Sequence, residues 1–229
     1  MESSNAGGTR RRRALVAGLL CLVAFALLTW NAVGEIGLAR VDPDVQDLVV
    51  RHRVGWLTDA FRALTWLGST TVLALVLVAV GAFLLITRRD VVGAILPATA
   101  LAVTIVAKNE AKMLIGRPRP SPEWAIGSNT GFAFPSGHAA DSLAAYAMLV
   151  LILSTGRSLH ARWAIRFAAA GVVLVVGASR VYLGAHWFTD VLGGWALAGA
   201  IVAILTWAFP RKTPRLDPSL KPPGGPART

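Results

Sequence analysis

The sequence predicts an all-α membrane protein with six transmembrane helices and both termini in the cytoplasm. Of its 229 residues, 55% are hydrophobic and only 15% are charged, and the mean hydropathy is +0.58. A hydrocarbon core about 30 Å thick needs roughly 20 apolar residues per helical span. Six windows reach or approach that length, and their apolar runs are continuous rather than alternating, which argues against a membrane β-barrel. The windows are 14–34, 65–87, 91–115, 138–155, 163–179 and 189–209.

Basic residues predict the orientation of these spans. The formal net charge is +11, and fourteen Lys or Arg residues flank the windows on alternate sides of the predicted membrane. Cytoplasmic loops carry an excess of Lys and Arg, so the pattern puts the N-terminus inside. The basic excess is therefore topological: it favours contact with anionic lipid head groups and gives no reason to expect a nucleic-acid partner. The fourteen residues are Arg10, Arg11, Arg12, Arg13, Arg88, Arg89, Arg157, Arg162, Arg166, Arg211, Lys212, Arg215, Lys221 and Arg228.

We expect one membrane domain with two short flanks. Residues 1–13 form a basic cytoplasmic N-terminus, and residues 14–210 form the six-helix domain. Residues 211–229 hold five prolines and no apolar period, which predicts a disordered cytoplasmic tail. The first apolar run ends without a small-x-small cleavage site, so we expect a retained anchor rather than a cleaved signal peptide. The expected location is the cell membrane.

The segment 35–64, between the first two windows, is mixed in character. Asp42 followed by Pro43 is typical of a helix N-cap and a proline at the first helical position. Side chains then recur at helical spacing, which predicts a short helix on the outer leaflet. These side chains are Val45, Leu48, Val49 and His52. The helix is equally compatible with a cap over a functional site and with a surface element that has no catalytic part.

Two polar stretches that are distant in the sequence fall on the same predicted side of the membrane. The third window ends in the charged run 108–112, and charges at such a depth by default face a bundle interior or a water-filled cavity. The loop 116–137 follows the third crossing, and the segment 180–186 follows the fifth. An odd number of crossings puts both on the extracytoplasmic face, so they can form one site.

His186 and Asp190 form a pair of candidate catalytic residues with a defined helical spacing. They stand four residues apart at the start of the last window, so they lie one helical turn apart on one face. A carboxylate bonded to one imidazole nitrogen fixes the tautomer and leaves the other nitrogen as a nucleophile or base. The alternative is an interfacial histidine followed by an aspartate that the helix N-terminus favours.

Three basic residues on the same predicted side of the membrane as this pair are candidates for binding an anion. Charge on a phosphoryl group in transfer spreads over its equatorial oxygens, and fixed cations there lower the barrier. Lys112, Arg119 and Arg180 are the candidates, although each alone is equally compatible with an interfacial basic residue. We interpret Arg117 as such an interfacial neighbour rather than as a phosphate ligand.

The run Pro135-Ser136-Gly137-His138 opens the fourth window. A glycine turn into a helix N-terminus exposes backbone N–H groups to an anion, and the Ser136 hydroxyl adds a donor. His138 can then protonate the departing oxygen as a general acid. Three alternatives stay open: a simple helix cap, a nucleophilic Ser136 without the usual Gly-x-Ser-x-Gly elbow, and metal ligation by His138, His186 and Asp190.

Asp141 lies one turn after His138, at a depth where a carboxylate needs a partner. We expect it to pair with Lys108, Lys112 or His138 and to support the phosphate site from behind. An aspartate that faces water near a helix N-terminus is the alternative.

These motifs together resemble the three-part signature of the type 2 phosphatidic acid phosphatase superfamily, whose members include lipid phosphate phosphatases and polyprenyl-diphosphate phosphatases. The signature covers residues 112–190. Its parts are Lys112-x6-Arg119-Pro120, Pro135-Ser136-Gly137-His138 and Ser179-Arg180-x5-His186-x3-Asp190.

The resemblance implies a role for each matching residue. His186 would take the phosphoryl group as phosphohistidine, Asp190 would orient it, and His138 would protonate the leaving group. Phosphate oxygens would be held by Lys112, Arg119, Ser136, Gly137 and Arg180. No metal or other cofactor is expected.

The expected function is hydrolysis of a membrane lipid phosphate or diphosphate on the extracytoplasmic face. Phosphatidic acid, phosphatidylglycerol phosphate and polyprenyl diphosphate all fit as substrates. Two alternatives stay open. One is transfer of the phosphoryl group to an acceptor other than water, and the other is a non-catalytic lipid-phosphate binding or transport protein.

Overall fold

The computed structural model describes residues 2–209, and every regular element in that range is helical. Five helices are long and apolar enough to cross a membrane. They are α1 (Glu2–Gly34), α4 (Thr70–Arg88), α5 (Val91–Ile115), α7 (Leu159–Tyr182) and α8 (Phe188–Ala208). A sixth apolar helix, α6 (Gly137–Leu153), is shorter, at 17 residues. The all-α prediction is confirmed, and each predicted window corresponds to one of these helices.

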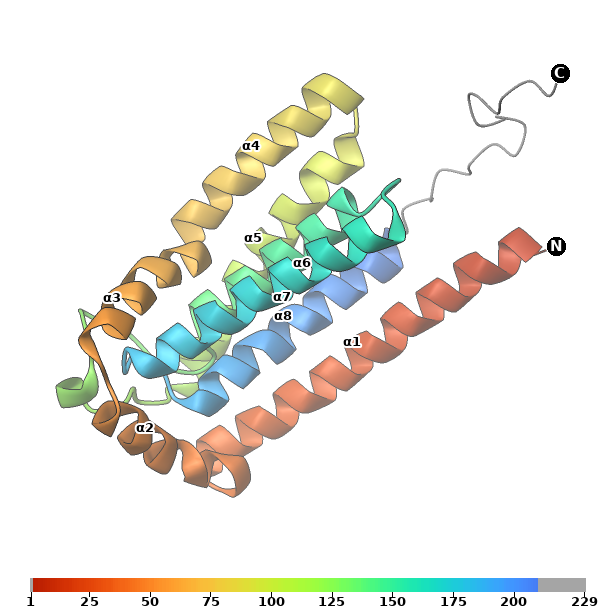
Figure 1. Ribbon diagram of the computed structural model, residues 1–229. Helices are drawn as coiled ribbons and strands as arrows, with labels where there is room; N and C mark the ends of the chain where they lie inside the picture. Colours follow the sequence, from red (N-terminus) through yellow and green to blue (C-terminus); the bar gives the residue numbers. More distant parts are fainter. Residues whose placement is uncertain (1, 210–229) are drawn as a thin grey trace, which may run out of the picture.

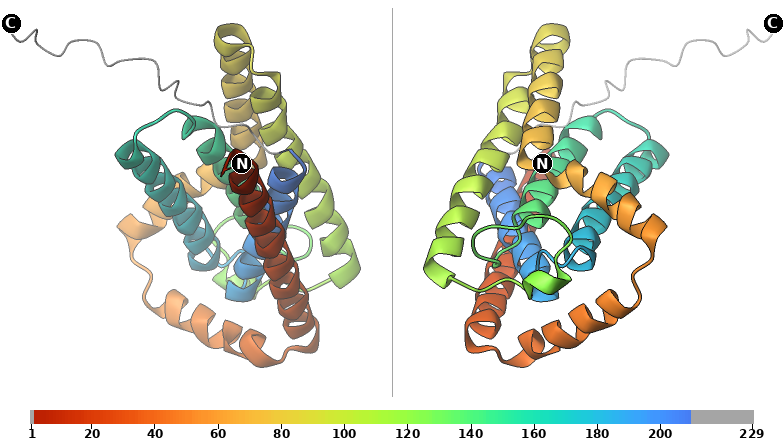
Figure 2. Two further views of the ribbon diagram at one scale, coloured as in Figure 1. Left: turned by 90° about the vertical axis from the view of Figure 1, so that its right-hand side faces the viewer. Right: turned by 90° about the vertical axis from the view of Figure 1, so that its left-hand side faces the viewer.

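The long helices run side by side, and the short elements gather at one end of the bundle (Figure 1). That end carries α2 (Asp42–Arg51), α3 (Gly55–Leu64) and the loop 116–136. The N-terminus and the α4–α5 and α6–α7 turns lie at the opposite end. Helix α6 packs against α5, α7 and α8, and α1 lies along α8 (Figure 2). The short elements and the loop 116–136 therefore share one end of the bundle, and the other end consists of the N-terminus and two tight turns.

Local sequence signals explain where the helices begin and end. The side chains of Ser69, Asp90 and Ser158 each accept a hydrogen bond from the backbone three residues on, which caps α4, α5 and α7. Helix α5 ends at Gly116, whose φ of 64° is left-handed and suits glycine. The chain then turns into the loop that carries Arg117 and Arg119.

Small residues allow α6 to sit at the centre. Ala139, Ala140 and Ala144 are fully buried on its surface. Opposite them on α8, a Cβ added to Gly194 would lie 2.6 Å from the carbonyl oxygen of Ser136. Lipid tails supply little hydrophobic drive between helices, so close approach through small residues is the main source of such packing.

The segment 35–64 folds onto the polar end of the bundle. Helix α2 matches the predicted helix, and α3 is an additional one. Val45 and Val49 pack against a buried cluster of Ala139, Val181 and Val191, so α2 is attached to the end where the signature residues meet.

The basic N-terminal flank belongs to the first helix. Helix α1 begins at Glu2, so the basic residues up to Arg13 continue the first span without a break. The predicted disordered tail, 211–229, lies outside the described residues.

Candidate functional site

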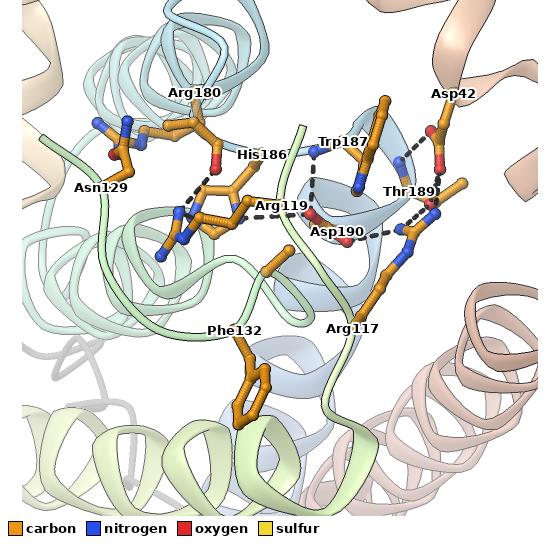
Figure 3. Close-up of polar contacts among 12 residues, drawn as sticks. Asp42, Arg117, Arg119, Asn129, Phe132, Arg180, His186, Trp187, Thr189 and Asp190 are labelled. Atoms are coloured by element: carbon orange, nitrogen blue, oxygen red, sulfur yellow. Dashed lines mark hydrogen bonds and ion pairs between the residues drawn. The ribbon is translucent and has the colours of Figure 1, made fainter. Parts of the chain in front are cut away.

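His186 occupies the short connection between α7 and α8 and is 3% exposed. The N–H groups of Ala185 and His186 both donate to the carbonyl oxygen of Arg180, which fixes the turn. One imidazole nitrogen, Nδ1, lies 3.4 Å from Asp190 Oδ2. The other, Nε2, lies 3.4 Å from Arg119 Nη1 (Figure 3). The ring is therefore held between a carboxylate and a guanidinium.

Both oxygens of Asp190 are engaged. Oδ2 accepts the backbone N–H of Trp187 at 2.9 Å, and Oδ1 accepts Arg117 Nη1 at 2.6 Å. Asp190 lies in the first turn of α8, where unpaired N–H groups favour a carboxylate. Its orientation toward His186 thus follows from the helix start and from Arg117 together.

Arg117 joins three segments of the chain. Its Nη1 also donates to Thr189 Oγ1 at 2.8 Å, and its Nη2 donates to Asp42 Oδ2 at 2.7 Å. Arg117 is only 8% exposed and pairs with two carboxylates, so it is not the simple interfacial residue that the sequence suggested; that it is a neighbour of the phosphate site rather than a phosphate ligand stays a prediction. The planar guanidinium fork can serve two carboxylates at once, which a lysine could not do with the same geometry.

Asp42 caps another helix instead of its own. The N-cap position of α2 is Val41, so the predicted N-cap role of Asp42 is wrong. The Asp42 carboxylate accepts the backbone N–H of Thr189 at 3.0 Å and also binds the Thr189 hydroxyl. Asp42 therefore satisfies the N-terminus of α8 from the side and ties α2 to it, as Figure 3 shows.

The three candidate phosphate-binding cations converge around the loop 129–133. Lys112 donates to the carbonyl oxygens of Phe132 and Ala133 at 2.6 and 3.2 Å. Arg119 donates to Thr130, Gly131 and Ala185 carbonyl oxygens, and Arg180 donates to Asn129 Oδ1 and Thr65 Oγ1. Neutral oxygens therefore partly offset the charges of the three cations, from backbone carbonyls for Lys112 and Arg119 and from side chains for Arg180.

The Ser136 turn lies directly beside Asp190. The Ser136 N–H donates to the Asp190 carbonyl oxygen at 2.9 Å. Ser136 stands at the N-cap position of α6, yet its hydroxyl makes no capping bond and is buried without a hydrogen-bond partner among the described residues. The same holds for Arg180 Nε. Buried polar atoms are normally paired, so these two donors mark a site that can take an additional acceptor.

Behind the turn, Asp141 forms a buried ion pair with Lys108 and accepts the Thr70 hydroxyl at 2.5 Å. Lys108 is one of the three partners that the sequence allowed. A Cβ added to Gly137 would lie 3.3 Å from Lys108 Nζ, so the lysine lies directly under the turn. His138, the next residue, packs against Gly68.

Burial and the nearby cations keep His186 neutral. Loss of solvent lowers its pKa well below the usual value, and the positive charges of Arg180, Lys112 and Arg119 lower it further. A hydrogen bond with the Ala133 carbonyl opposes this shift but is the smaller effect. An imidazole that stays neutral keeps a lone pair for attack on an electrophile.

The described residues contain no group of three or more His, Cys, Asp or Glu side chains that could hold a metal ion. The alternative in which His138, His186 and Asp190 form a metal site therefore finds no cluster of the required kind.

Comparisons with known proteins agree on one family. The model of the PAP2 superfamily matches residues 91–214. Phosphatidylglycerophosphatase B of Bacillus subtilis (strain 168) is 30% identical over 198 residues, which cover 85% of this chain and 95% of that protein. This chain belongs to the PAP2 superfamily. The resemblance seen in the three motifs is thereby confirmed.

Two solved PAP2-like structures share the fold. A crystal structure of a transmembrane PAP2-type phosphatidylglycerolphosphate phosphatase from Bacillus subtilis superposes with a TM-score of 0.75 at 25% identity, covering 83% of this chain and 94% of that one. Aquifex aeolicus LpxE superposes with a TM-score of 0.58 at 25% identity, covering 74% and 96%.

Sequence reasoning missed the part of this PAP2 site that lies outside the motifs. Asp42 is 147 residues from Thr189, and no local pattern links the two. For Arg117 a signal was present, because a second arginine two residues before Arg119 in a turn is well placed for the same polar end. The structure shows that Arg117 points to the carboxylates and Arg119 to the histidine.

We expect Arg117→Met to lower the free energy of unfolding by about 3–5 kcal/mol, because it leaves two buried carboxylates without their cation. Arg51→Met is the matched control. Arg51 forms an exposed ion pair with Asp47 within α2, and loss of this pair should have no measurable effect on the free energy of unfolding. Unfolding in detergent, followed by circular dichroism, compares the two. Equal stability of the two variants would contradict the bridging role of Arg117. A double-mutant cycle that combines Arg117→Met with Asp42→Asn measures the coupling energy between these two residues.

We also expect the His186 imidazole to titrate below about 6.5, the ordinary value. Arg119→Gln removes a nearby positive charge, so the imidazolium becomes less unfavourable and the pKa of His186 should rise. Nitrogen-15 NMR of histidine-labelled protein in detergent follows both titrations, and the His186→Gln spectrum identifies the signal. A His186 pKa that is unchanged or lower in Arg119→Gln would show that this guanidinium does not act on the ring.

Proposed function

We propose that this PAP2 protein is an integral-membrane phosphatase that hydrolyses a lipid phosphate or diphosphate through a phosphohistidine at His186. The observation that carries the proposal is the position of His186 between Asp190 on Nδ1 and Arg119 on Nε2. Asp190 on Nδ1 leaves the lone pair of Nε2 as the nucleophile, and Arg119, which faces Nε2 in this structure, can bind the phosphoryl oxygens instead. Two relatives named as phosphatidylglycerol phosphate phosphatases support the hydrolysis of a lipid phosphate.

The proposed reaction has two steps. Nε2 of neutral His186 attacks phosphorus, the bond from phosphorus to the ester or anhydride oxygen breaks, and His138 gives that oxygen a proton. Water then attacks the phosphohistidine with His138 as the base, the P–N bond breaks, and inorganic phosphate leaves. Asp190 orients the ring and stabilises the positive charge that it gains in the first step.

The phosphate oxygens are proposed to bind Lys112, Arg119, Arg180, the Ser136 hydroxyl and the N–H of Gly137. Two of these groups, Ser136 Oγ and Arg180 Nε, are among the buried donors without partners in the described range. The cations now contact neutral oxygens of the loop 129–133. Exchange of such contacts for phosphate oxygens pairs each cation with an anionic acceptor, so Coulomb attraction is added to the hydrogen bond.

Lys108 and Asp141 are proposed to brace this site without touching the substrate. Their ion pair lies below the Ser136–Gly137 turn. The fixed lysine there keeps Gly137 and its N–H in place, so the pair would act through the backbone of the turn.

The proposed topology has six spans, with α6 as the short fourth one, both termini in the cytoplasm and the site on the extracytoplasmic face. It is supported by the distribution of basic residues and by the collection of polar elements at one end of the bundle. A substrate head group at that end keeps its tails within the bilayer. Phosphatidylglycerol phosphate is the first substrate to test, because the named relatives act on it.

We expect His186→Ala to lower phosphate release from phosphatidylglycerol phosphate by at least about 10³-fold and to abolish phosphate labelling of the enzyme. The exposed His52 provides the matched control, and His52→Ala should retain both signals. Malachite-green assay and acid-quenched ³²P labelling are the measurements. Full turnover by a folded His186→Ala protein would refute the mechanism.

Chelation should leave turnover unchanged, since Lys112, Arg119 and Arg180 already supply the positive charge that a metal would bring. The measurement is the initial rate of detergent-solubilised enzyme before and after dialysis against EDTA. A rate that falls in EDTA and returns only with a divalent cation would contradict a metal-independent reaction.

A further inference from the structure

A groove lies at the end of the bundle opposite the candidate site. It has a volume of about 740 Å³ and opens to the surface between α1 and α7, with α6 and α8 as its floor. In the left view of Figure 2, α1 crosses in front of α8 and α7 lies beside it. None of the proposed catalytic residues lines it. The groove is therefore separate from the candidate site.

The lining changes from apolar to basic along its length. The deep part is formed by side chains such as Leu143, Val173 and Trp195, and the mouth by Arg10, Arg13 and Arg166. No acidic residue occurs among the described residues of the lining. Arg166 makes a cation–π contact with Trp163, in which its guanidinium carbon lies 5.0 Å from the ring centroid.

The length of the groove matches one leaflet. On α8 it extends from Trp195 to Thr206, which at about 1.5 Å per residue is about 16 Å. Half of a hydrocarbon core of about 30 Å is nearly the same. An acyl chain that fills the groove from its mouth would thus end near the middle of the membrane, and its head group would lie beside the arginines.

We propose that this groove binds one anionic phospholipid of the leaflet opposite the catalytic site. Its acyl chain lies between α1 and α7, and its phosphate contacts Arg10, Arg13 and Arg166. Basic pockets between transmembrane helices are suited to acidic lipid head groups, because the arginines meet the phosphate at the depth where the apolar walls end. The site is independent of the proposed catalysis.

The head-group part is tested by native mass spectrometry of the purified protein with phosphatidylglycerol or phosphatidylcholine. The wild type should retain one phosphatidylglycerol with clear preference over phosphatidylcholine. Arg10→Gln with Arg13→Gln should weaken phosphatidylglycerol binding by about tenfold or more. Arg11→Gln with Arg12→Gln removes the same charge from the same helix but outside the groove, and should change nothing.

The acyl-chain part is tested by filling the groove. Ala170 lines it and Ala168 on the same helix does not. Ala170→Trp should weaken the binding of both lipids, and Ala168→Trp should not. Equal effects of the two arginine pairs, or unaltered binding in Ala170→Trp, would overturn the proposal. So would a protein dimer that dissociates in Ala170→Trp, because a second copy would then be the occupant.

Discussion

The two buried ion pairs of Arg117 are the interaction on which the polar end of the molecule depends. One guanidinium joins Asp42, at the start of α2, to Asp190, at the start of α8. A buried charge without partners is very unfavourable, so each of the three groups requires the other two. Because Arg117 binds Oδ1 of Asp190, Oδ2 is the oxygen that faces His186. The pair of Arg117 with Asp42 attaches α2 to the bundle.

The charge balance around His186 follows from that arrangement. Asp190 is the nearest carboxylate, and Arg117 already engages it. Lys112, Arg119 and Arg180 are therefore left with the neutral oxygens of loop and side-chain groups as partners. The result is a positive, poorly solvated region around a neutral imidazole, which suits an anionic phosphoryl group.

The membrane explains the contrast between the two ends. Large apolar side chains on α1 and α4, such as Leu20 and Val78, are exposed on the outside of the bundle because lipid is their solvent. Seven of the twelve buried polar residues in the described range lie where α2, the loop 116–136 and the start of α8 meet. At the opposite end the arginines lie at the mouth of an apolar groove. Each end therefore carries positive charge, within a buried site at one end and at the mouth of a surface groove at the other.

The sequence by itself determined the helical class, the approximate spans and the residues of the three motifs. Apolar length and motif spacing are local properties, so they can be recognised without a fold. Only the tertiary structure decided how Arg117 and Arg119 divide between carboxylates and histidine, and that Asp42 serves α8 rather than α2. It also decided that Lys108, rather than Lys112 or His138, pairs with Asp141. These choices depend on which chain segments meet in space, because a buried charge takes the partner that packing brings within reach.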